Sequence, residues 1–132
     1  MGSIGTISEA ASLAFHSMGL LAKRGNQVTT KEIAQTTGQS HAHLSKVLQR
    51  LVKAGLVRST TGPHGGFVLA KPADQITLLE IYEAIEGPIE VPKCLLGRKR
   101  CLFGTCILED SLTKLTEEFR DFLAGKRLSD VA

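Results

Sequence analysis

The chain has 132 residues, of which 42% are hydrophobic and 22% are charged, a composition typical of one globular domain with a modest core. No stretch approaches the roughly 20 apolar residues of a membrane-spanning helix, and no signal peptide is recognisable. We therefore expect a cytoplasmic protein without membrane contact. The net charge of +3 is unevenly distributed, because residues 1–71 are strongly basic whereas residues 72–92 contain acids and no base. The basic front half favours a polyanionic partner.

The first predicted helix runs from about Ser8 to Lys23, and Gly25 follows it as a stop signal. Its apolar face consists of Leu13, Ala14, Met18, Leu21 and Ala22. This spacing predicts a helix that is part of the core. Glu9 and His16 lie on the same helix, and each is either a surface group or a candidate metal ligand.

A helix-turn-helix pair is predicted next. Thr29 and Glu32 have the spacing of a capping box, and Gly38 ends the short helix that they open. Ser40 then caps a second helix. The apolar stripe of that helix has helical spacing and consists of Leu44, Val47, Leu48, Leu51 and Val52. Two helices joined by a short turn containing glycine are typical of this motif.

The opposite face of the second helix is polar and basic. It consists of Ser40, His41, His43, Ser45, Lys46, Gln49, Arg50 and Lys53. In DNA-binding helix-turn-helix proteins, the start of the second helix meets base edges and basic groups meet phosphates. The alternative is a solvated helix without a nucleic-acid partner.

A β-hairpin is predicted after this pair, with strands over residues 55–61 and 67–70 and a loop over residues 62–66 that is rich in glycine. Helix, turn, helix and hairpin occur in the order of a winged helix. In such folds the hairpin tip reaches the DNA backbone or minor groove, where Thr61 and His64 are candidate contacts. The predicted fold class is mainly α with a small β-hairpin wing.

Two further helices complete the prediction. Thr77 and Glu80 form a second capping box for a helix that ends at Glu86, before Gly87. The last helix runs to Ala124. Its apolar seam alternates spacings of four and three and consists of Leu108, Leu112, Leu115, Phe119 and Phe122. We interpret this seam as a dimer interface, with burial against the same chain as the alternative.

All three cysteines, Cys94, Cys101 and Cys106, lie in one short segment. A metal or cluster site and a disulfide with one spare thiol both need such a segment, and the odd number of cysteines favours the metal. Six residues separate the first pair and four the second, wider than usual structural zinc spacing. A fourth ligand must come from elsewhere in the chain or from a second subunit.

In combination, these features resemble the bacterial winged-helix regulators that bind iron-sulfur clusters, of the IscR, NsrR and RirA type. The matching stretches are residues 56–57, 62–71, 76–81 and 84–88, followed by the three cysteines. The resemblance divides the chain into a DNA-binding domain over residues 1–88, a cluster-binding loop over residues 89–107 and a dimerisation helix and tail over residues 108–132.

The resemblance implies a nucleoid-associated homodimer that binds double-stranded promoter DNA under control of a [2Fe-2S] or [4Fe-4S] cluster. Cys94, Cys101 and Cys106 would be ligands, with His16 or Glu109 as the fourth and Glu9 behind them. The cluster would sense nitric oxide, redox state or iron supply. Thr61 stands where IscR-type regulators place a wing arginine, so a different target sequence is expected.

Two other functions remain open on the sequence alone. One is a regulator on the same fold whose cysteines bind zinc or form a reversible disulfide. The other is a small redox electron carrier, against which the basic front half and the wing both argue. No nucleophile-base pair, P-loop or dinucleotide fingerprint is present in the sequence, so we do not expect an enzyme.

Overall fold

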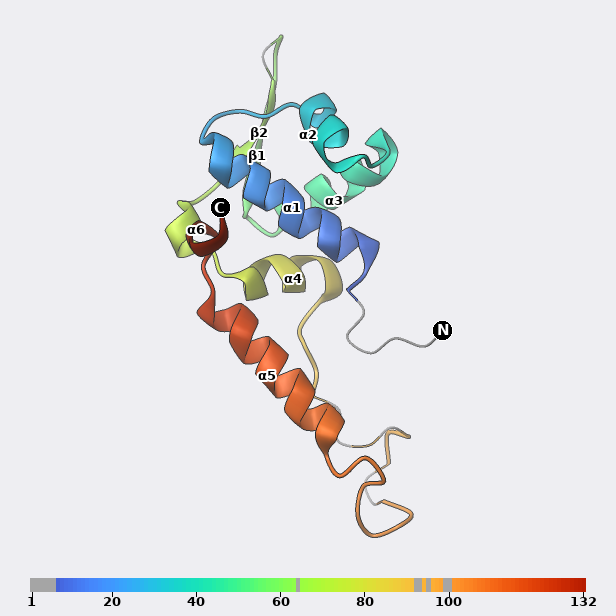
Figure 1. The fold of residues 1–132 in the computed structure, drawn as a ribbon. Helices are drawn as coiled ribbons and strands as arrows, with labels where there is room; N and C mark the ends of the chain where they lie inside the picture. Colours follow the sequence, from blue (N-terminus) through green and yellow to red (C-terminus); the bar gives the residue numbers. More distant parts are fainter. Residues whose placement is uncertain (1–6, 64, 92–93, 95, 99–100) are drawn as a thin grey trace.

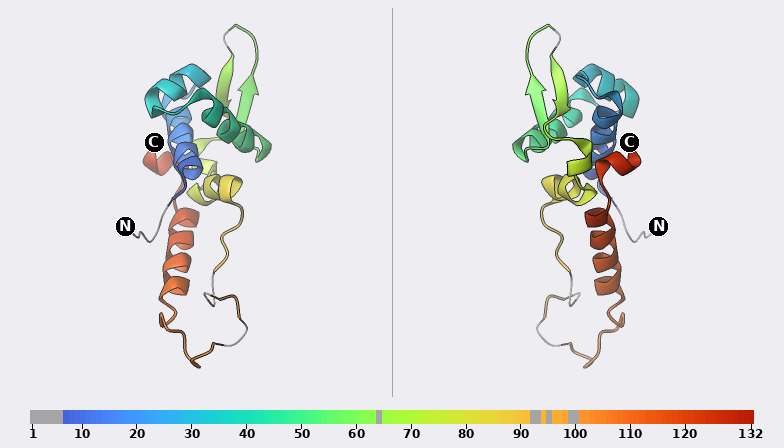
Figure 2. Two further views of the ribbon diagram at one scale, coloured as in Figure 1. Left: turned by 90° about the vertical axis from the view of Figure 1, so that its right-hand side faces the viewer. Right: turned by 90° about the vertical axis from the view of Figure 1, so that its left-hand side faces the viewer.

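In the computed structural model of the chain, residues 7–63, 65–91, 94, 96–98 and 101–132 are described. The elements are α1 (Glu9–Arg24), α2 (Thr30–Thr37), α3 (His41–Lys53), β1 (Val57–Thr60), β2 (Gly66–Leu69), the 3-10 helix η1 (Ala73–Gln75), α4 (Leu78–Glu86), α5 (Ser111–Gly125) and α6 (Leu128–Val131). The hairpin projects from one end of the helical body, and α5 extends from the other (Figures 1 and 2). The predicted fold class is confirmed.

The helices begin where the sequence places their caps. Ser8 accepts a hydrogen bond from the Ala11 amide at 3.0 Å, and Ser40 accepts one from the His43 amide at 3.2 Å. Both bonds of the Thr29 capping box are present. Gly38 ends α2 with a φ of 71°, a left-handed conformation that glycine adopts without a steric penalty. Local side-chain chemistry therefore determines these helix boundaries.

The hydrophobic core lies around α1, which packs against α2, α3 and α4. Its largest fully buried side chains include Met18, Leu21, Ile33, Leu44, Leu48, Leu51, Ile76 and Ile81. The apolar stripes of α1 and α3 thus face each other, as their spacing predicts. Within the described residues, none of the helices is both long and apolar enough to cross a membrane.

The hairpin, called the wing below together with its loop, is a two-stranded antiparallel sheet. Val57 pairs with Leu69 at its base, and Thr60 pairs with Gly66 beside the loop. β1 is shorter than the predicted 55–61, and β2 is shifted by one residue from the predicted 67–70. Gly55 has a φ of 78° and belongs to the turn that ends α3, so that β1 starts only at Val57.

The C-terminal tail was not predicted to fold. Residues 126–128 return to the winged part of the chain, where the Leu128 amide donates to the Ile76 carbonyl at 2.8 Å and the Leu78 amide donates to the Lys126 carbonyl at 3.0 Å. Leu128 is only 1% exposed. The C-terminal end of α5 is therefore anchored beside the start of α4.

The prediction that Leu108 belongs to the last helix is wrong. Glu109 and Asp110 have φ values of 53° and 62°, and this left-handed backbone separates Leu108 from α5. The helix begins at Ser111, with Asp110 at its N-cap position. The apolar seam of α5 therefore starts at Leu112.

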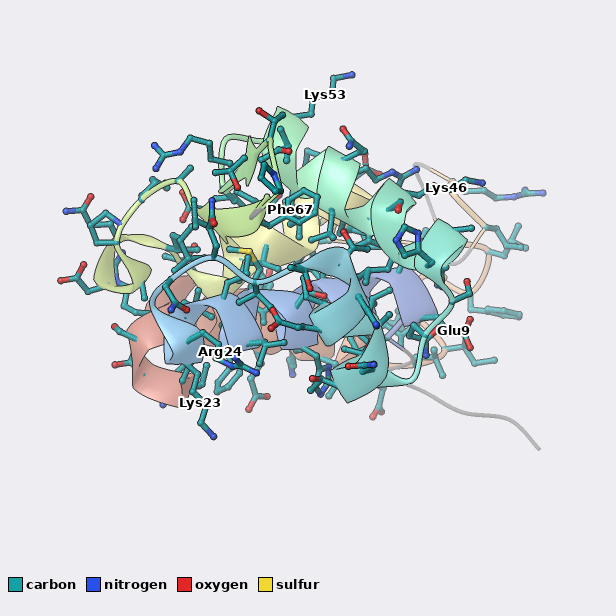
Figure 3. The ribbon with its side chains drawn as sticks, turned by 90° about the horizontal axis from the view of Figure 1, so that it is seen from above. Glu9, Lys23, Arg24, Lys46, Lys53 and Phe67 are labelled. Atoms are coloured by element: carbon teal, nitrogen blue, oxygen red, sulfur yellow. The ribbon has the colours of Figure 1, made fainter. Side chains whose placement is uncertain are left out.

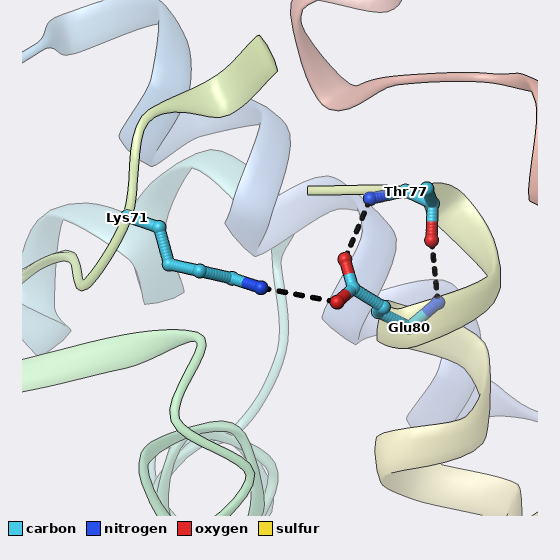
Figure 4. A network of polar contacts seen from close by, with 3 residues as sticks. All are labelled: Lys71, Thr77 and Glu80. Carbon is cyan, nitrogen blue, oxygen red and sulfur yellow. Dashed lines mark hydrogen bonds and ion pairs between the residues drawn. The ribbon is translucent and has the colours of Figure 1, made fainter. Parts of the chain in front are cut away.

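A polar network joins the end of the wing to the start of α4 (Figure 4). Glu80 accepts from the Thr77 amide at 2.8 Å, and the Thr77 hydroxyl accepts from the Glu80 amide at 3.1 Å. Lys71 pairs with the same carboxylate at 3.0 Å. Partial burial acts to raise the pKa of Glu80, but the Thr77 amide and Lys71 together lower it below its ordinary value of 4.5.

We predict that Glu80→Gln lowers the free energy of unfolding at neutral pH, because glutamine keeps an acceptor for Thr77 but loses the charge that attracts Lys71. A lowered pKa in the folded state stabilises the protein above about pH 4.5, and this contribution is lost as the pH falls through the folded-state value. Urea unfolding of both proteins between neutral pH and about pH 3 measures the difference. Glu118→Gln, on exposed α5, is the control. A difference between wild type and Glu80→Gln that does not change with pH would contradict the assignment.

Candidate nucleic-acid interface and cysteine loop

The predicted recognition residues lie on one side of α3. Leu44, Leu48 and Leu51 are fully buried on the inner side. The outer side consists of Ser40 at the N-cap, exposed His41 and Lys46, half-buried His43 and Ser45, and exposed Arg50. Hydrogen-bonding side chains are therefore concentrated at the first turn of the helix, the part that enters a major groove in helix-turn-helix proteins.

The charge of this surface suits a phosphate backbone. Residues 41–53 contain no acid, and the N-terminus of a helix carries a partial positive charge. Figure 3, which looks down from the wing side, shows Lys46 and Lys53 along the outer side of α3 and Lys23 and Arg24 on the opposite side of the molecule. Lysine side chains in such positions bind phosphates without reading the base sequence.

Arg50 has a role that its sequence position does not reveal. Its Nη1 donates to the Ile85 carbonyl at 3.1 Å. The last carbonyls of a helix lack partners within the helix, and a cation near them is favourable. Arg50 therefore ties α3 to the C-terminal end of α4, and the prediction that it also contacts DNA stays a prediction.

The two predicted contacts in the wing differ in what the structure describes. Thr61 is exposed and follows directly after β1. His64 lies outside the described residues. The wing points away from the helical body on the side where α2 and α3 lie (Figure 2).

The segment from residue 94 to residue 106, called the cysteine loop below, contains three free, half-buried thiols. The backbone amides of Arg98 and Leu96 lower the pKa of Cys94 below its ordinary value of 9.0, while partial burial opposes them. The Gly97 amide and the positive charge of Arg98 lower it further. This turn favours the thiolate, which is the form of cysteine that binds metals and reacts with oxidants.

A second turn surrounds Cys101. Its thiol donates to the Thr105 carbonyl at 3.0 Å, and its own carbonyl accepts from the Gly104 amide at 3.3 Å. The Cys106 carbonyl accepts from the Glu109 amide at 2.9 Å. Each thiol thus belongs to its own local turn.

The fold of a single chain does not bring the predicted metal ligands close together in space. Among the described residues, no group of three His, Cys, Asp or Glu side chains is placed to hold a metal ion. His16 and Glu9 line a groove of about 850 Å³ beside α1, whereas the cysteine loop lies beyond the N-terminal end of α5 (Figure 1). Glu109 is exposed and follows Cys106 closely in sequence. Of the three predicted fourth ligands, only Glu109 belongs to the same part of the chain as the thiols.

The apolar seam of α5 is mostly open to solvent. Leu115 is 51% exposed, Phe119 37% and Phe122 52%, whereas Leu123 on the inner side is 3% exposed. Phe119 and Tyr82 of α4 form a T-shaped ring pair with centroids 6.0 Å apart. A groove of about 640 Å³ between the two helices continues this apolar surface. Burial against the same chain therefore accounts for Leu123 but leaves most of the seam uncovered.

Comparison with known proteins gives a consistent result. The family described as Rrf2, iron-dependent transcriptional regulator, matches residues 7–132. A helix-turn-helix-type transcriptional regulator of Aquifex aeolicus is 33% identical over 115 residues, which are 85% of this chain and 80% of that protein. The regulator IscR of Erwinia tasmaniensis is 32% identical over 105 residues, 79% of this chain and 63% of that protein.

Solved structures are similar over nearly the whole chain. CymR, the global cysteine regulator of B. subtilis, has a TM-score of 0.81 and 29% identity, and the match covers 96% of this chain and 95% of that one. IscR of T. potens has a TM-score of 0.76 and 25% identity, with 98% and 88% covered. The oxidized form of Staphylococcus aureus CymR has a TM-score of 0.74 and 26% identity, with 93% and 92% covered.

These relatives are named as transcriptional regulators, which agrees with the expectation that the chain is not an enzyme. The winged helix, the basic outer side of α3 and the family match all indicate DNA binding. The chain belongs to the Rrf2 family of iron-dependent transcriptional regulators.

Proposed function

We propose that this protein is a dimeric regulator whose affinity for promoter DNA depends on the state of the cysteine loop, and that Cys94, Cys101 and Cys106 hold an iron-sulfur cluster. The observation that carries the proposal is the presence of three free, partly accessible thiols in one loop between α4 and α5. Thiolates are the usual ligands of such clusters, and the turn at Cys94 favours the thiolate. The chemistry of the donor set therefore fits the group.

The fourth ligand is Glu109 or a residue of α1 from a second subunit, with His16 ahead of Glu9. Glu109 is available within the same part of the chain. His16 is exposed, and its Nδ1 lies 2.7 Å from the Ser12 carbonyl. That contact leaves Nε2 as the nitrogen for a metal, a common arrangement for ligating histidines.

Control of DNA binding would act through the two helices that flank the loop. A bound cluster would be the group that responds to nitric oxide, redox state or iron supply. Three thiolates held in common would shorten and order the connection between α4 and α5. The protein's own residues then carry the change onward, because Tyr82 packs on Phe119 and Arg50 binds the carbonyl of Ile85.

Each segment of the chain has its own role in this proposal. Residues 1–88 would bind DNA, residues 89–107 would hold the cluster and α5 would form the dimer interface. The exposed Leu115, Phe119 and Phe122 support the last assignment, since a second copy of α5 would cover them. The tail after α5 packs on the winged part and so connects the dimer helix to the DNA-binding part.

A thiol switch is the second candidate. In this version two of the three thiols form a reversible disulfide, releasing two protons and giving two electrons to an oxidant or a disulfide acceptor. The lowered pKa of Cys94 favours such chemistry. The similar structures of CymR, one of them an oxidized form, support it as well. A zinc site on the same cysteines is the metal-binding variant of this candidate.

We predict that Cys101→Ala abolishes the visible absorption of anaerobically purified protein and leaves a folded dimer, because one of the proposed cluster ligands is lost. Absorption spectra, iron and sulfide assays and sedimentation measure this. Thr105→Ala, in the same loop, is the control and should keep the wild-type spectrum. A full native cluster in Cys101→Ala would contradict the ligand assignment, and a colourless wild type that forms a disulfide would support the thiol switch.

We predict that His43→Ala and Lys46→Ala weaken promoter binding in different ways. Loss of His43 should reduce sequence preference by about tenfold, since it removes a base-edge contact. Loss of Lys46 should weaken binding to all DNA sequences alike. It should also lower the slope of log affinity against log salt concentration by about one. Affinities measured at several salt concentrations separate the two effects. Lys23→Ala removes the same charge from the opposite side, and unchanged affinity in all three variants would refute the docking.

We predict that Leu115→Glu raises the dimer dissociation constant by at least about tenfold, because a buried carboxylate without a partner is costly at an interface. Sedimentation velocity over a range of protein concentrations measures it. Lys114→Glu introduces the same side chain on the neighbouring, exposed position and should leave the dimer intact. If both variants stay dimeric, α5 is not the interface.

A further inference from the structure

The linker between α1 and α2 pairs with the wing at a single β-bridge, between Val28 and Phe67. The Val28 amide donates to the Phe67 carbonyl at 3.0 Å, and the Phe67 amide donates to the Val28 carbonyl at 2.9 Å. A Cβ at Gly66 would lie 2.6 Å from the Val28 oxygen, so glycine is needed for this close approach. The linker then continues into Thr29, the N-cap of α2. The wing is thus joined to the helix-turn-helix pair at this point.

The hydroxyl of Thr60 sits at the loop end of the wing and uses its whole hydrogen-bonding capacity. It donates to the Gly66 carbonyl at 3.1 Å and accepts from the Gly66 amide at 3.0 Å. The side-chain amide of Gln27 supplies the remaining contact by donating to the same oxygen. A hydroxyl has one donor and two acceptor sites, and all three are filled. Gln27 therefore connects to the last strand pair before the loop.

Next to this contact, a groove lies between the described part of the wing loop and the start of α2. It has a volume of about 450 Å³ and is lined by Asn26, Gln27, Thr29, Glu32 and Pro63. Within the described residues, Gln27 is the linker residue whose side chain hydrogen-bonds to the wing, while Val28 pairs with Phe67 through its backbone and is buried in the same core cluster. The Gln27–Thr60 contact therefore adds, near the wing tip, to the packing of β1 on α3 and of β2 on α1 that holds the wing.

We propose that Gln27 is a positioning residue for DNA binding, which acts through Thr60 to hold the wing tip at the spacing from α3 that lets both touch one duplex. The proposal rests on the proposed docking of α3 and the wing. Gln27 lines the groove together with Glu32, whose carboxylate repels phosphate. This neighbour favours an indirect role over contact with DNA, and Gln27 is exposed, so its replacement leaves no cavity.

The test uses two duplexes. The first is recovered by the wild-type protein from a random-sequence library, and the second is the same sequence trimmed to remove the outer base pairs that the wing protects in a footprint. Binding is measured for Gln27→Leu, Thr60→Val and the double variant. Thr60→Ser restores the hydroxyl, and Gln75→Ala replaces an exposed glutamine away from the wing. Urea unfolding checks that every variant is folded.

We expect Gln27→Leu and Thr60→Val each to weaken binding of the full duplex about three- to tenfold, the usual effect of losing one hydrogen bond. The double variant should bind no more weakly than either single variant, because both changes break the same contact. Binding of the trimmed duplex should not change, and Thr60→Ser and Gln75→Ala should bind both duplexes like wild type.

Four results would overturn the inference. Equal losses on the full and trimmed duplexes would place the effect at α3 instead of the wing. Additive losses in the double variant would show that Gln27 does not act through Thr60, and unchanged affinity would show that the contact does not position the wing. If the wild-type protein recovers no preferred sequence at all, the proposed DNA-binding function fails, and the inference fails with it.

Discussion

The packing of α4 determines how the two ends of the molecule are related. Ile81 and Ile85 are buried in the core, and Tyr82 stacks on Phe15 of α1 with ring centroids 6.4 Å apart while its edge contact with Phe119 holds α5. The last turn of α4 also accepts the hydrogen bond from Arg50 of α3 and, through Glu86, one from Ser8 at the start of α1. One short helix thus contacts α1, α3 and α5.

The chain leaves this turn and enters the cysteine loop a few residues later. The loop and the wing lie at opposite ends of the molecule (Figure 1), so under the proposed function a change in the loop would reach DNA only through the packed elements between them. α5 is held at its C-terminal end by the hydrogen bonds of Leu78 and Leu128, and its N-terminal end adjoins the loop. In a dimer built on α5, a small rotation of this helix would alter the distance between the two copies of α3, which must match one helical turn of DNA. A group bound at the loop would shift this arrangement only by the difference in its affinity for the two states.

Much of the fold could be predicted from the sequence because its signals are local. Thr29, Ser40 and Thr77 cap their helices as predicted, since a cap needs only a side-chain oxygen within three residues of a free amide. The α6 tail was missed because its burial depends on Leu128 meeting Ile76, a contact between residues far apart in sequence. The start of α5 was misplaced because spacing alone does not reveal the left-handed backbone at Glu109 and Asp110.

The candidate sites likewise contain features that local sequence predicts and features that depend on tertiary contacts. The outer side of α3 follows from helical periodicity, so residues such as His41 and Lys46 could be placed on it in advance. The inward bond of Arg50 could not, because periodicity places a residue on a face and does not show where a long side chain ends. A ligand set spread over Cys94, Cys106 and His16 depends on tertiary and quaternary arrangement, which no spacing in one chain specifies.

The central claim is that the state of the cysteine loop controls DNA affinity. The most direct measurement is the dissociation constant for one selected duplex, determined without oxygen for protein that contains its iron and for the same preparation after iron removal. Our account predicts a difference of about fivefold or more, which Cys101→Ala should abolish. Equal affinities of the two forms, with the duplex still bound specifically, would contradict it.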